Sequence, residues 1–102
     1  MRQRADAWNT AEPLGAVEAK KLIDQIRREG GVAWTAHAVH ELEADDMTVA
    51  DGLRILRNGW VEEPELKARK WRYRVQNQEA TLVVQFESPT RILVITGWRC
   101  RG

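Results

Sequence analysis

The chain of 102 residues contains a single cysteine, Cys100, which excludes an intrachain disulfide. A chain that does not depend on disulfides suits a reducing compartment, so we expect it in the cytoplasm. The sequence has no apolar run near the length of a membrane span and no signal-peptide pattern, so we expect no membrane partner. Only 7 glycines and 3 prolines are present, without repeats or low-complexity segments. This composition predicts one globular domain over residues 14–102, preceded by an irregular lead-in over residues 1–13.

Several sequence signatures of catalysis are also missing. There is no P-loop, glycine-rich dinucleotide fingerprint, serine-hydrolase elbow or paired-carboxylate signature. His37, His40 and the distant Cys100 lack the fourth ligand and the spacing of a zinc site. We therefore expect no metal and no cofactor.

Hydrophobic periodicity predicts an α+β fold with helices on one face of an antiparallel sheet. The expected order is an N-terminal helix, a short strand, two short helices and a meander of strands. Helices are expected over 14–29, 35–44 and 48–58, short strands near 32–34 and 60–62, and a charged loop over 64–70. The meander strands are expected near 71–76, 82–86 and 92–98, with turns at 77–79 and 88–90.

The first meander strand is the most informative stretch. Trp71, Tyr73 and Val75 alternate with polar residues, so one face of the strand is apolar and points to the core. Arg72 and Arg74 occupy the opposite face. The last strand is almost continuously apolar and is expected to be buried on both sides.

Charge is divided unevenly along the chain. Residues 1–64 carry 8 Lys/Arg against 12 Asp/Glu, a net charge of −4, whereas residues 65–102 carry 8 against 3, a net charge of +5. The predicted sheet is therefore basic and the predicted helical part acidic, which favours a polyanionic ligand for the sheet.

A cluster of cations surrounds the start of this basic part. It contains Lys67, Arg69, Lys70, Arg72 and Arg74, interleaved with two aromatic residues. Phosphate contacts combined with base stacking are what single-stranded nucleic acid requires. The alternative is a solvated strand edge whose charges prevent edge-to-edge aggregation.

The C-terminal end adds further candidates. Trp98 could stack on a base, while Arg99 and Arg101 could reach the same phosphates. His37 lies three residues before His40 on a predicted helix and could act as a general acid or base, or simply be a surface histidine. The carboxylates of residues 41–46 are expected to form a solvated helix end.

From Thr35 onward, about two-thirds of the chain resembles bacterial domain-of-unknown-function family 4258, which is related in fold to the RelE, BrnT and MqsR toxins. The matching features are His37-Ala38 at a helix start, the D-D-M-T turn, the helix ending at Asn58-Gly59, the acids Glu62-Glu63, the WRYRV strand and the closing ILVITGWR. The turn over 43–46 is acidic, where the family usually has arginine and glycine.

The resemblance implies a RelE-like sheet and a toxin-like, metal-independent ribonuclease, neutralised by a cognate antitoxin. In such enzymes the basic sheet face holds RNA, including RNA on the ribosome, and the 2′-hydroxyl attacks the adjacent phosphate. His37, Arg72, Arg74 and Arg99 are the catalytic candidates that the resemblance implies. The RNA-binding candidates are Lys67, Arg69, Lys70, Trp98 and Arg101.

Two other functions fit the same sequence. A non-catalytic module could bind nucleic acid or the ribosome through the basic face, with strong salt dependence and no cleavage. An antitoxin-like or immunity-like module would instead use the acidic helical part, Glu41 to Asp51, to bind a basic partner protein.

Overall fold

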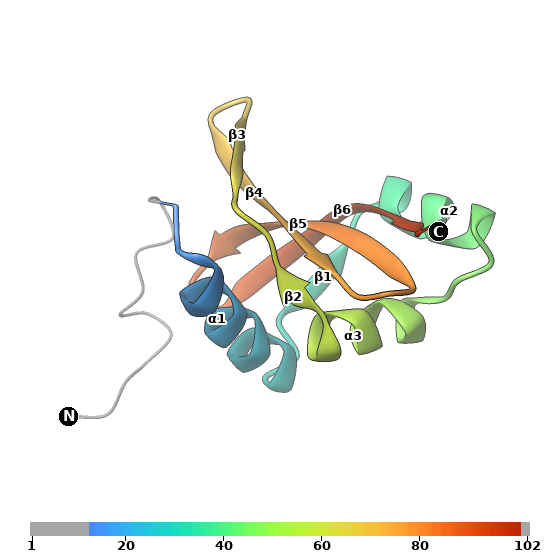
Figure 1. Ribbon diagram of the computed structural model, residues 1–102, viewed down its shortest axis with the longest axis horizontal. Helices are drawn as coiled ribbons and strands as arrows, with labels where there is room; N and C mark the ends of the chain where they lie inside the picture. Colours follow the sequence, from blue (N-terminus) through green and yellow to red (C-terminus); the bar gives the residue numbers. More distant parts are fainter. Residues whose placement is uncertain (1–12, 101–102) are drawn as a thin grey trace.

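The computed structural model describes residues 13–100, which form three helices and a six-stranded sheet (Figure 1). The helices are α1 (Ala16–Arg28), α2 (Ala36–Ala44) and α3 (Val49–Asn58). The strands are β1 (Val32–Trp34), β2 (Trp60–Val61), β3 (Glu65–Lys67), β4 (Lys70–Gln76), β5 (Ala80–Ser88) and β6 (Arg91–Arg99). The predicted α+β class and the predicted order of elements are confirmed. The predicted lead-in, apart from Pro13, lies outside the described residues.

The strands are arranged in the order β1-β6-β5-β4-β2, and β3 pairs with β4 beyond the end of β2. Strands β4, β5 and β6 form the predicted antiparallel meander. Strand β1 runs parallel to β6, with Val32 opposite Ile92 and Trp34 opposite Val94. The sheet is therefore mostly, but not entirely, antiparallel.

Helices α1 and α3 pack together on one face of the sheet (Figure 1). Their ends follow from the sequence. Glu18 accepts a hydrogen bond from the Gly15 amide at the start of α1, and Gly30 takes a positive φ of 78° after its end. Thr48 and Asp51 form a capping box at the start of α3.

The core lies between these helices and the sheet. Tyr73 and Val75 of β4 are buried there, as the alternation in the sequence predicted. Their neighbours include Leu82, Val84, Ile92 and Val94 from the sheet and Leu22, Ile23, Ile26, Ile55 and Leu56 from the helices. A Cβ on Gly52 of α3 would lie 2.5 Å from Cη2 of the Trp34 ring, so the bare backbone allows α3 to pack closely against β1.

Three local predictions are wrong. The segment predicted as a charged loop forms a hairpin, because β3 pairs with β4 through a turn at Ala68 and Arg69. Leu53 is 37% exposed, although its helical spacing with Val49 and Leu56 predicts that it belongs to the apolar stripe of α3. Strand β6 is not buried on both sides, since Leu93, Ile95 and Thr96 on it are only half-buried.

Candidate nucleic-acid interface

The face of the sheet turned away from α1 and α3 carries a basic groove. Because Tyr73 and Val75 point into the core, Arg72 and Arg74 point to the opposite face of β4. Arg74 pairs with Val83 of β5, and Val83 pairs in turn with Thr96 of β6, so the three residues form one row across the sheet. The groove has a volume of about 190 Å³ and is lined by Glu65, Lys67, Arg72, Arg74, Val83, Thr96 and Trp98. We call it the sheet-face groove.

The side chains of the two arginines in the groove differ in their partners within the protein. Nη2 of Arg74 lies 3.4 Å from Oε1 of Glu65, and the two side chains are 51% and 65% exposed. An exposed pair at this distance contributes little to stability, so an anion in solution can compete for Arg74. Nε of Arg72 is buried and has no hydrogen-bond partner among the described residues. No ion pair within residues 13–100 involves Arg72, so no carboxylate of the described residues competes for its guanidinium when an anion enters the groove.

Trp98 provides an apolar surface at one side of the groove. It is paired with Thr81, which places it on the same face as Arg74, and its side chain is 40% exposed. A large aromatic ring left open to solvent beside arginines is suited to stacking on a nucleic-acid base.

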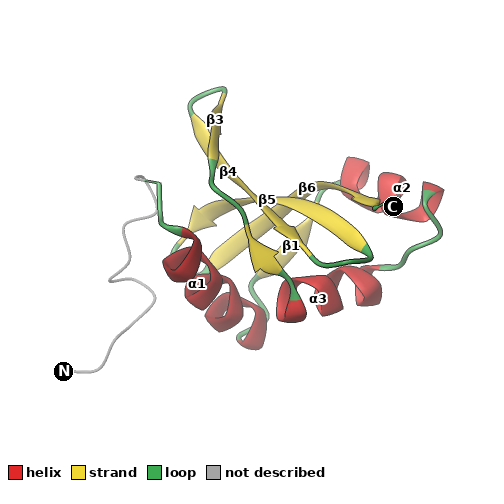
Figure 2. Cartoon of the chain, in the orientation of Figure 1, coloured by secondary structure: helices red, strands yellow, loops and turns green. Residues whose placement is uncertain are grey.

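The hairpin formed by β3 and β4 projects from the rest of the sheet (Figure 2). Lys67 and Lys70 are directly opposite each other across it, and Arg69 lies in the turn between them. All of these residues are exposed. Like charges directly opposite each other destabilise a pair of strands, so this arrangement costs stability unless an anion neutralises it.

Arg99 does not lie with Arg72 and Arg74, and the prediction that the three arginines share one surface is wrong. Arg99 pairs with the buried Ala80, which places it on the other face of the sheet. Its Nε donates to the Asp45 carbonyl at 3.1 Å and its Nη2 to the Asp46 carbonyl at 3.2 Å. The Asp45 carboxylate accepts a hydrogen bond from the Arg99 amide at 2.7 Å. Arg99 therefore holds the C-terminal end of α2 against β6, and Asp45 is not simply a solvated acid as predicted.

The remaining candidates are placed as follows. His37 and His40 are exposed on α2, as expected, and neither lines the sheet-face groove. Arg101 lies outside the described residues. Between residues 13 and 100, no three His, Cys, Asp or Glu side chains come together in a way that could hold a metal ion.

The resolved pKa shifts concern residues that do not line the groove. Burial raises the pKa of Tyr73, whose hydroxyl accepts a hydrogen bond from the Leu14 amide at 2.8 Å. Hydrogen bonds from Thr48 lower the pKa of Asp51, and a hydrogen bond to Glu79 raises that of Arg54.

Three lining residues were not among the predicted site residues. Glu65 was missed because its segment was interpreted as a loop, and a loop gives no face to a side chain. Thr96 could have been found from the alternation of Thr96, Gly97 and Trp98 at the end of β6. Val83 carries no signal that distinguishes it from a core residue.

Compared with protein-family models, with curated proteins and with solved structures, the chain has no match in any of the three. None of the helices within residues 13–100 is both long and apolar enough to cross a membrane.

Proposed function

We propose that this protein binds single-stranded RNA in the sheet-face groove. The observation that carries the proposal is a groove in which Arg72, which has no ion pair within residues 13–100, lies with Lys67, Arg74 and an exposed Trp98. A guanidinium that lacks an acceptor is a site for a phosphate oxygen, and an adjacent aromatic ring is a site for a base.

The shape of the groove supports a single strand over a duplex. Its volume of about 190 Å³ lies across four strands, β3 to β6, with Trp98 at the β6 side and Lys67 at the hairpin. A stacked base needs an unpaired nucleotide, because bases within a duplex already stack on each other. The exposed cations of the hairpin, Lys70 and Arg69, would extend the phosphate contacts along the strand.

The resemblance to RelE-like toxins extends the proposal to cleavage. In that form the protein is a cytoplasmic, metal-independent ribonuclease kept inactive by an antitoxin. Arg72 and Arg74 would stabilise charge on the phosphate during attack by the 2′-hydroxyl. The residues that line the groove include no histidine, and Arg99 is bound to α2, so the geometry supports binding more strongly than cleavage.

The test is RNA binding by fluorescence anisotropy, with an unstructured labelled RNA and the variants Arg72→Ala, Arg74→Ala and Trp98→Ala. We expect each variant to weaken binding by about tenfold, which corresponds to the loss of one charge-assisted or stacking contact. Arg91→Ala is the matched control, because Arg91 is an exposed arginine of β6 that does not line the groove. Equal affinities for wild type and the groove variants would refute the proposal.

Incubation of the same RNA with and without EDTA tests cleavage separately. Metal-independent cleavage should persist in EDTA and be lost in Arg72→Ala. Intact RNA in every lane, together with groove-dependent binding, would identify a binding module and exclude the ribonuclease.

A further inference from the structure

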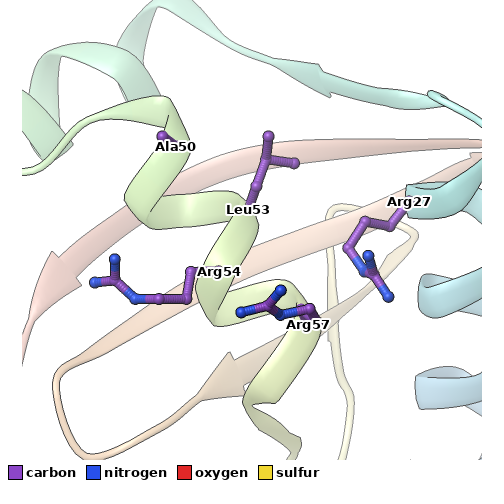
Figure 3. A pocket seen from close by; sticks show the side chains of 5 residues that line it. All are labelled: Arg27, Ala50, Leu53, Arg54 and Arg57. Atoms are coloured by element: carbon purple, nitrogen blue, oxygen red, sulfur yellow. The ribbon is translucent and has the colours of Figure 1, made fainter.

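The outer surface of the helices carries a second basic groove, on the other side of the sheet from the first. It lies between α1 and α3, has a volume of about 470 Å³ and is lined by Arg27, Ala50, Leu53, Arg54 and Arg57 (Figure 3). We call it the helix-face groove. The net charge of residues 1–64 is −4, so the charge count of the sequence gives no indication of a basic groove in this part of the chain.

Leu53 gives this groove an exposed apolar side chain. Its neighbours on α3, Gly52 and Ile55, are buried in the core, whereas Leu53 is 37% exposed. An isolated exposed leucine is ordinary on a protein surface. Here it lies beside three arginines, whose guanidinium groups are all on one side of it (Figure 3), so an apolar group placed on Leu53 would have cations along one side.

Two of the three arginines have few hydrogen-bond or ion-pair partners within the protein. Nε of Arg27 is buried without a partner among the described residues, and its Nη2 lies 3.5 Å from Asp24. No ion pair within residues 13–100 involves Arg57. Only Arg54 is well paired, with Asp51 at 3.1 Å and Glu79 at 3.0 Å.

The directions of the side chains indicate the kind of ligand. The three guanidinium groups lie apart from one another in a row and do not converge on one point (Figure 3). A single phosphate could contact only one of them well, whereas a chain with several carboxylates could contact them in turn. We propose that the helix-face groove docks an acidic polypeptide segment, with one apolar side chain on Leu53 and carboxylates beside Arg27 and Arg57.

Long-range charge favours such a segment over RNA. Electrostatic interactions at physiological salt are screened over about 8 Å. Asp24, Asp51 and Glu79 already pair with Arg27 and Arg54, so a short segment is attracted mainly by Arg57, which has no ion pair within residues 13–100. A long RNA would also approach the acids of the negatively charged helical part, which include the exposed Glu43 and Asp46.

The experiment uses the full chain and a fluorescein-labelled synthetic peptide in which glutamates and aspartates flank one central leucine. Arg57→Glu should weaken binding of this peptide by at least about tenfold, since it replaces attraction by repulsion. Leu53→Ser should weaken it by several-fold and leave its salt dependence unchanged. Arg28→Glu is the matched control, because Arg28 is an exposed arginine of the same helix as Arg27 that does not line the groove.

Neither Arg57 nor Leu53 is buried, so both variants are expected to fold, and their melting temperatures verify this. RNA binding at the sheet-face groove should be unchanged in both, so failure of one proposal does not imply failure of the other. The inference is overturned if the peptide does not bind to the wild type. It is also overturned if Arg28→Glu weakens binding as much as Arg57→Glu, if only Arg72→Glu weakens it, or if Arg57→Glu abolishes RNA binding.

Discussion

The contact between Glu65 and Arg74 decides how freely an anion can enter the sheet-face groove. Glu65 is the one carboxylate among the residues that line it, and its Oε1 lies 3.4 Å from Nη2 of Arg74. A phosphate in the groove would be repelled by Glu65 and would compete with it for Arg74. The carboxylate therefore weakens the binding of any anion.

We expect Glu65→Gln to tighten RNA binding by about two- to fivefold, because an exposed ion pair contributes about 0.2–1 kcal/mol. The measurement is the dissociation constant for the unstructured RNA at fixed salt. Glu87→Gln is the control, since Glu87 is an exposed acid of β5 outside the groove and its neutralisation should leave the affinity unchanged. Unchanged or weaker binding by Glu65→Gln would show that RNA does not approach this carboxylate.

Ionisation of Tyr73 makes the stability of the fold depend on pH in the alkaline range. Burial raises its pKa above the ordinary value of 10.0, so the folded protein keeps the proton where the unfolded chain loses it. This contribution to stability is fully present below pH 10.0 and is lost as the pH rises through the pKa of the folded state. We expect the free energy of unfolding to fall across this range.

Ultraviolet absorbance follows this ionisation directly, because Tyr73 is the single tyrosine of the chain. Its midpoint should lie above 10.0 in the native protein and return to about 10 in urea. Tyr73→Phe lacks the ionisable group and should lose less stability over the same alkaline range. A native midpoint at or below 10.0 would contradict the prediction.

At the scale of elements, the turn of the β3–β4 hairpin is unusually strained. Ala68 and Arg69 are the two central residues of the turn, and both have positive φ, 51° and 67°. Positive φ at both central residues is a common requirement of two-residue hairpin turns. Asparagine and glycine adopt this conformation readily, whereas alanine and arginine do so at a cost of about 1–2 kcal/mol each. The backbone is therefore strained at the tip of the β3–β4 hairpin, where the cations project.

Ala68→Asn should slow hydrogen exchange of the β3 amides by about fivefold, because relief of about 1 kcal/mol of strain lowers the population of the open hairpin. RNA affinity should be unchanged, since no cation is removed. The double variant Ala68→Asn/Arg69→Gly should slow exchange further but weaken RNA binding. Exchange of the β5 amides is the internal control and should not change.

The same hairpin shows where prediction from sequence fails. Helices and long strands were predicted correctly because caps, apolar spacing and alternation extend over many residues, as in α1 and β4. The hairpin was missed because its turn lacks the glycine or asparagine by which such turns are recognised. The parallel pairing of β1 with β6 was missed because β1 is only three residues long and joins a strand distant in sequence.

At the scale of the whole molecule, prediction of the site succeeded only in part. The pattern of β4 correctly placed Arg72 and Arg74 away from the core, since alternation determines the face of a strand. Arg99 was misplaced because its surroundings depend on how α2 packs against β6, which no local pattern reveals. The helix-face groove was hidden for the same reason, since its arginines come from two helices and only packing brings them together.

Because the two basic grooves are separate, the salt dependence of RNA binding in variants of each groove shows which groove binds RNA. Three cations line the sheet-face groove, namely Lys67, Arg72 and Arg74. If each contacts one phosphate, log Kobs should fall with log salt with a slope of about −2, since each contact on a single strand contributes about −0.7.

Arg74→Ala should make the slope shallower by about 0.7, whereas Arg57→Ala, in the other groove, should leave it unchanged. A slope near zero would exclude phosphate contacts altogether. A slope that changes with Arg57 but not with Arg74 would place RNA on the helices, against the arrangement of charge in this fold.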